Sequence, residues 1–106
     1  MNFSALDTNA FKNMHEEGSY VLLDVRTPEE FTSGHLKGAE NYDFYNENFE
    51  DEIDGLDKKK KYLVYCKAGD RSRQAMFLMR DLGFEEVYNL EGGIIAWNKL
   101  GFNTEK

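Results

Sequence analysis

The one cysteine of the chain, Cys66, ends an apolar run and opens a short polar segment that contains Gly69. A loop of this kind between a strand and a helix can turn successive backbone N–H groups toward one point, and the helix that follows adds its positive end. Such a point attracts an anion, and it favours a thiolate over a thiol. The segment therefore predicts an anion-binding loop around a nucleophilic sulfur. Its charged side chains are Lys67, Asp70, Arg71 and Arg73.

A second interpretation of Cys66 involves no chemistry. Free cysteines often act as small buried hydrophobic residues, and Cys66 considered alone favours this structural role. Gly69 and the two arginines that follow favour a functional role, since nearby positive charge activates a thiol.

Three short apolar runs predict the strands that position this loop. Residues 20–23 and 62–65 are β-branched or aromatic and apolar on both faces, which is typical of buried parallel strands. Residues 86–90 follow a turn and precede two glycines, so they predict a third strand.

Helical spacing separates these runs. Apolar residues repeat on one face over 10–14, around 49–56 and over 75–82. Residues 27–30 predict a further helix start, with Thr27 as the N-cap, Pro28 at the first helical position and Glu30 capping back, and a last short helix is predicted over 93–100. Asp7 and Gly18 are expected to begin and end the helix that contains residues 10–14. Gly83 is expected to end the helix over 75–82, and Gly55 lies within the pattern at 49–56.

Strands that alternate with helices predict an α/β domain with a mainly parallel sheet and helices on both faces. Residues 1–106 contain no repeat or linker, so we expect one domain. Such sheets bind their ligands at the carboxyl ends of strands. Two segments fall there, residues 24–26 and 66–72.

Composition argues against several classes of protein. The chain has 13 Lys and Arg against 20 Asp and Glu, a net charge of −7, which opposes nucleic-acid binding. No apolar run approaches the roughly 20 residues of a membrane span. A single cysteine forms no intramolecular disulfide and suits a reducing compartment. We therefore expect a cytoplasmic protein with no nucleic-acid or membrane partner.

Other polar residues are interpreted as scaffold. Arg26 and Glu30 stand four apart across a helix start, close enough to pair, and Asp24 at a strand end can accept hydrogen bonds from nearby turns. His35 is predicted to be a hydrogen-bonded turn residue. Because His15 belongs to a separate helix, no zinc site is expected. Trp97 is predicted to be core.

Four motifs, in order and spread over nearly the whole chain, resemble the rhodanese-type sulfurtransferases in their small single-domain form. The first is Leu-Asp-Val-Arg at 23–26 with Glu30 and Phe31, and the second is Gly-His-Leu at 34–36 with Gly38, Ala39 and Asn41. The third is the loop at 66–72. The fourth is Leu-Glu-Gly-Gly at 90–93 with Ala96 and Trp97.

The resemblance implies a rhodanese-like three-layer domain with a sheet of about five strands. It implies that Cys66 takes a sulfane sulfur from a donor such as thiosulfate, becomes a persulfide, and passes the sulfur to cyanide or to a thiol such as thioredoxin, glutathione or a protein cysteine. Asp24 and Arg26 would support the site, and no metal or organic cofactor is implied. The loop residues implied to cradle the donor anion and the persulfide are Lys67, Ala68, Gly69, Asp70, Arg71 and Ser72, with Lys67 and Arg71 supplying charge to the leaving sulfite.

Two alternatives stay open. A persulfide carrier or partner-binding module would turn over thiosulfate poorly, and two residues favour it: Lys67 stands where many family members have Arg, and Asp70 puts a negative charge in the loop. A phosphatase or arsenate reductase is less favoured, because four residues separate Cys66 from Arg71. The phosphatase-type signature has five residues between its cysteine and its arginine, and that longer loop makes room for a tetrahedral oxyanion. By resemblance, the shorter loop goes with sulfur transfer.

Overall fold

The computed structural model describes residues 2–106. Its sheet has five parallel strands in the order β1-β5-β4-β2-β3. The predicted parallel sheet is therefore confirmed. The elements in chain order are β1 (Asn2–Leu6), α1 (Thr8–Glu17), β2 (Tyr20–Asp24), α2 (Pro28–Ser33), β3 (Glu40–Asn41), α3 (Phe49–Asp54), β4 (Lys61–Tyr65), α4 (Asp70–Asp81), β5 (Glu86–Leu90) and α5 (Gly93–Lys99).

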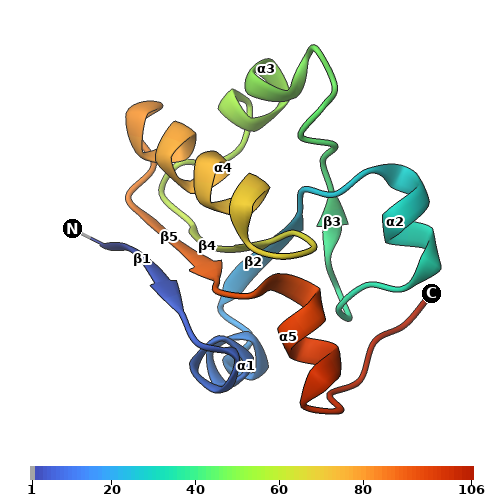
Figure 1. Cartoon of the computed structure of the whole chain (residues 1–106). Helices are drawn as coiled ribbons and strands as arrows, with labels where there is room; N and C mark the ends of the chain where they lie inside the picture. The colour runs from blue at the N-terminus through green and yellow to red at the C-terminus, as the bar shows by residue number, and fades with distance from the viewer. Residues whose placement is uncertain (1) are drawn as a thin grey trace.

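Helices cover both faces of this sheet, with α3 and α4 on one side and α1 and α5 on the other (Figure 1). Alternation along the strands divides the core in the same way. Leu23 and Val64 point into the cluster beneath α3 and α4, while their neighbours Leu22 and Leu63 point into the cluster beneath α1 and α5. The neighbouring strands β2 and β4 are therefore apolar on both faces, as expected.

The predicted helix signals are confirmed. Asp7 caps α1 by accepting a hydrogen bond from the backbone N–H of Ala10 at 2.8 Å. Thr27 and Glu30 form a capping box at the start of α2, which satisfies backbone donors that the helix leaves free. The final helix lies at 93–99, one residue shorter than predicted.

The sequence pattern did not predict two of the strands, β1 and β3. Strand β1 lies at the sheet edge and most of its residues are exposed, so it lacks a continuous apolar run. Strand β3 has two residues, too few for any periodicity. Within residues 2–106, no helix is long and apolar enough to cross a membrane.

Candidate active site

Strand β4 delivers Cys66 to the carboxyl edge of the sheet, and the chain then loops into α4. The loop turns back so that donors converge on the sulfur. The Sγ atom accepts hydrogen bonds from the backbone N–H of Gly69 at 3.1 Å and of Ser72 at 3.4 Å, and the Ser72 hydroxyl lies 3.3 Å away. Only 1% of Cys66 is exposed. Hydrogen bonds and a helix N-terminus directed at one sulfur stabilise negative charge on it.

Helix α5 holds the first half of the loop in place. The Ile94 N–H donates to the Cys66 carbonyl at 2.9 Å, and the Ile95 N–H donates to the Lys67 carbonyl at 3.1 Å. The loop can approach this closely because Gly93 has no side chain: a Cβ there would collide with the Lys67 carbonyl, and its φ is +61°. The Gly-Gly pair of the fourth motif is thus a contact surface for the cysteine loop.

Arg71 does not point a free guanidinium at the sulfur. It forms a two-pronged ion pair with Glu30 of α2, with N···O distances of 2.8 and 3.0 Å. Hydrogen bonding to Arg71 lowers the pKa of Glu30 to about 2, despite some burial. Glu30 in turn raises the pKa of Arg71, and the nearby charge of Cys66 adds to this. The expected pairing of Glu30 with Arg26 is therefore wrong.

Arg26 instead pairs with Asp24 at the end of β2. Its guanidinium donates to the Asp24 carboxylate at 2.7–3.1 Å and to the Gly34 carbonyl at 2.6 Å. Asp24 is completely buried and Arg26 is 4% exposed. Burial lowers the pKa of Arg26, but the hydrogen bonds and charge of Asp24 outweigh it, so the pKa stands above its usual value. The two residues hold a turn together.

The other predicted loop residues differ in their surroundings. Lys67, Ala68 and Asp70 are exposed on the outside of the loop. Gly69 adopts a φ of +106° close to the backbone of Gly92, which a side chain would hinder. The amides that reach the sulfur are thus those of Gly69 and Ser72.

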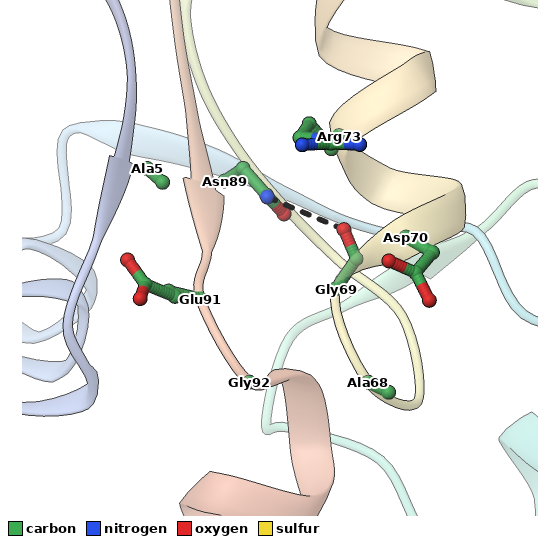
Figure 2. Close-up of a pocket in the computed structure, with 8 residues that line it drawn as sticks. All are labelled: Ala5, Ala68, Gly69, Asp70, Arg73, Asn89, Glu91 and Gly92. Carbon is green, nitrogen blue, oxygen red and sulfur yellow. Dashed lines mark hydrogen bonds between the residues drawn. The ribbon is translucent and has the colours of Figure 1, made fainter.

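Sequence reasoning missed Asn89, a buried polar residue near the carboxyl end of β5. Its amide oxygen accepts a hydrogen bond from the Ser72 hydroxyl at 2.5 Å, and its Nδ2 lies 3.4 Å from the Gly69 carbonyl (Figure 2). A polar residue between apolar residues at the end of a strand was the available signal.

The cavity in Figure 2 has a volume of about 270 Å³ and lies behind the loop, with Asn89 among its lining residues. It is bordered by Ala5 of β1 and by the charged side chains of Asp70, Arg73 and Glu91. Cys66 does not line it.

The remaining sequence assignments concern residues outside the loop. His35 is hydrogen-bonded as predicted, with Nδ1 3.0 Å from the Phe31 carbonyl and its ring stacked on Phe31. Its backbone forms an isolated antiparallel bridge with Glu105 and not a turn. Trp97 is core, 4% exposed. Across residues 2–106 no three His, Cys, Asp or Glu side chains are placed to hold a metal ion.

The fold and the cysteine loop agree with the results of comparison with known families. Residues 7–100 match the rhodanese-like domain. The chain belongs to this family.

Several curated proteins are similar over nearly all of the chain. A thiosulfate sulfurtransferase GlpE of Shewanella oneidensis is 34% identical, over 92% of this chain and 95% of that protein. Its namesake in Vibrio cholerae is 32% identical, over 98% and 96%. A tRNA uridine(34) hydroxylase of Cytophaga hutchinsonii is 39% identical, but this chain spans only 30% of that protein.

Solved structures show the same fold. A rhodanese-related protein from Thermoplasma volcanium superposes with a TM-score of 0.84 at 27% identity, covering 96% of this chain and 97% of the other. A rhodanese-like domain from Anabaena sp. gives 0.82 at 33% identity, covering 95% and 77%. The predicted three-layer rhodanese-like fold is confirmed.

Proposed function

We propose that this protein is a sulfurtransferase that carries a sulfane sulfur as a persulfide on Cys66. The observation that carries the proposal is the convergence of the Gly69 and Ser72 amides on the one sulfur of the chain. Relatives of nearly the same length bear the name thiosulfate sulfurtransferase, which supports thiosulfate as a donor.

In the first step the Cys66 thiolate attacks the sulfane sulfur of thiosulfate. A new S–S bond forms to Cys66, the bond between the sulfane sulfur and the sulfonate sulfur breaks, and its electron pair leaves with sulfite. No proton is gained or lost, and the charge of −3 is the same on both sides for a thiolate and a thiosulfate dianion. The loop amides stabilise the anionic sulfur throughout.

In the second step an external acceptor takes the terminal sulfur. Cyanide attacks it, the S–S bond breaks, thiocyanate leaves and the Cys66 thiolate is restored. A thiol acceptor forms a new persulfide by the same exchange. A single cysteine is sufficient for this cycle, because the acceptor comes from outside; glutathione, thioredoxin and a protein cysteine are all suitable by this chemistry.

A carrier with poor thiosulfate turnover is the second candidate, and one observation favours it. The Arg71 guanidinium is held by both oxygens of Glu30, so it is less available to grip a donor anion. Lys67 is exposed and offers a point charge in place of a planar fork. A protein or persulfide donor has less need of that grip than thiosulfate.

Intact mass spectrometry of the reduced protein, before and after thiosulfate, tests the proposal. We expect a gain of one sulfur atom that cyanide removes, with thiocyanate released. Cys66→Ser removes the nucleophilic sulfur, so it should show no gain while its far-UV circular dichroism stays that of the parent. An equal gain in the Cys66→Ser protein would contradict the assignment.

A second sulfur donor and a phosphatase substrate separate the alternatives. A carrier gains sulfur from a low-molecular-weight persulfide such as glutathione persulfide but little from thiosulfate. A phosphatase releases phosphate from an aryl phosphate and shows no stable sulfur gain with either donor. The failure of both sulfur donors would reject sulfur transfer.

A further inference from the structure

The Ser72 hydroxyl lies within reach of more acceptors than it can serve. Its oxygen is 3.3 Å from the Cys66 sulfur, 3.3 Å from the Gly69 carbonyl and 2.5 Å from Oδ1 of Asn89. A hydroxyl has one proton and donates one such hydrogen bond at a time. The shortest contact identifies Asn89 as the acceptor.

The orientation of the Asn89 amide follows from its other neighbour. The Gly69 carbonyl is an acceptor, 3.4 Å from Nδ2, so the amide N–H₂ must face it (Figure 2). The amide oxygen therefore faces Ser72. Reversing the amide would place two acceptors against each other. Asn89 is 2% exposed and Ser72 is fully buried, so water does not compete readily for these groups.

We propose that Asn89 is a positioning residue that draws the Ser72 hydroxyl proton away from the Cys66 sulfur. The inference rests on the proposed function and deepens it. In the reduced protein the serine then turns its lone pairs, not its proton, toward the sulfur. The thiolate is stabilised by the two loop amides and lacks this additional donor, which keeps it more reactive because nucleophilicity falls as a thiolate is stabilised.

The charged groups around this hydrogen-bond chain do not take part in it. Arg71 of α4 is the cation whose charge interacts with Cys66, and Glu30 of α2 binds its guanidinium. The side chain of Asn89 forms its hydrogen bonds with Ser72 and Gly69, neither of which carries a charge. The other charged residues near the loop and the cavity behind it are Lys67, Asp70, Arg73 and Glu91.

The pH dependence of Cys66 alkylation by iodoacetamide tests the role of Asn89. In Asn89→Ala the Ser72 proton turns to the sulfur, so we expect the midpoint of the profile to fall by about half a pH unit, a roughly threefold gain in thiolate below the midpoint. We also expect the rate at the high-pH plateau to fall, because a better stabilised thiolate is a weaker nucleophile.

A double-mutant comparison assigns the effect to the serine. In a Ser72→Ala background, Asn89→Ala should no longer lower the midpoint, because there is no hydroxyl to redirect. Val87→Ala is the matched control: it lies two residues earlier in β5, is equally buried and packs in the core, but has no polar atom in its side chain. Its alkylation midpoint should equal that of the parent.

The direction in which the alkylation midpoint shifts distinguishes the proposed role of Asn89 from a purely structural one. If Asn89 only held the loop together, Asn89→Ala would loosen the Gly69 and Ser72 amides and raise the midpoint. An upward shift, no shift, or a downward shift that persists without Ser72 overturns the proposal. Alkylation needs no sulfur donor, so failure here is distinct from failure of the mass-gain experiment, which tests the sulfur-transfer function itself.

Discussion

The turns that follow β2 and β4 lie side by side at the carboxyl edge of the sheet, yet the polar groups in the two turns have different kinds of partner. After β2, Asp24 and Arg26 neutralise each other inside the protein. After β4, the Cys66 sulfur accepts hydrogen bonds from backbone amides, and Arg71, whose charge interacts with Cys66, is shared with Glu30. The first turn is thus stabilised by a buried ion pair, whereas the second is organised by backbone hydrogen bonds to one sulfur.

Glu30 connects the two regions. It belongs to the helix that follows the first turn, where it caps Thr27, and it also orients the arginine of the second. The helix α2 therefore contributes to the reactive region through a carboxylate that never touches the sulfur. This arrangement fixes the position of the Arg71 charge but reduces its net field at the Cys66 sulfur.

The largest effect is expected from the paired region. Asp24→Asn removes the charge that neutralises Arg26 and leaves a buried guanidinium uncompensated, so the free energy of unfolding should fall by about 3–5 kcal/mol. Urea unfolding measures this. In the protein that remains folded, the alkylation profile of Cys66 should not change. A change in that profile of more than a few tenths of a pH unit would show that the two turns are not separable.

The second effect concerns the support of the loop. Gly93→Ala places a Cβ against the Lys67 carbonyl. We expect this collision to lower the free energy of unfolding by about 1–3 kcal/mol beyond the effect of the positive φ, and to lower sulfur uptake. Gly83→Ala is the matched control, with a φ of +96° and open space around the added carbon. Urea unfolding and sulfur gain by mass compare the two. Equal losses in both variants would contradict the contact role of Gly93.

The third prediction concerns the effect of the Arg71 charge on Cys66. Arg71→Ala should move the alkylation midpoint of Cys66 upward by about half to one pH unit, because it removes a positive charge near the thiolate. Arg73→Ala, two residues along the same helix and exposed, is the control and should move it much less. If both variants moved the midpoint equally, the general charge of the loop would matter and the position of Arg71 would not.

The smallest effect is expected from Glu30, which connects the two turns through its ion pair with Arg71. The pKa of Glu30 is lowered to about 2 from its usual 4.5, so its ion pair stabilises the fold above pH 4.5 and this stability is lost as the pH falls through about 2. Glu30→Gln should therefore cost under about 1 kcal/mol near neutral pH, since the pair is partly exposed. The difference from the parent should vanish near pH 2. A constant difference in urea unfolding across this range would indicate that lost capping alone is responsible.

Much of this architecture followed from local patterns. The Thr27 capping box, the helix stops at glycines and the apolar strands around Cys66 depend on residues a few positions apart, so their physics is contained in short segments. The residue pattern also predicted that the loop after Cys66 turns backbone N–H groups toward one point, and the Gly69 and Ser72 amides do converge on the sulfur. The edge strand β1 and the two-residue β3 lacked such a signal, because they exist only by pairing with neighbours already in place.

The amino-acid sequence by itself determined the class of fold and the position of the loop that follows Cys66. The tertiary structure decided which partners the polar side chains found. Glu30 pairs with Arg71, 41 positions away, and not with Arg26, and Ser72 meets Asn89 across 17 positions. Local spacing ranks only the nearby candidates, while packing of the strands and helices sets the distances between remote side chains. Those distances determine where the charge and the hydroxyl proton at this site are held.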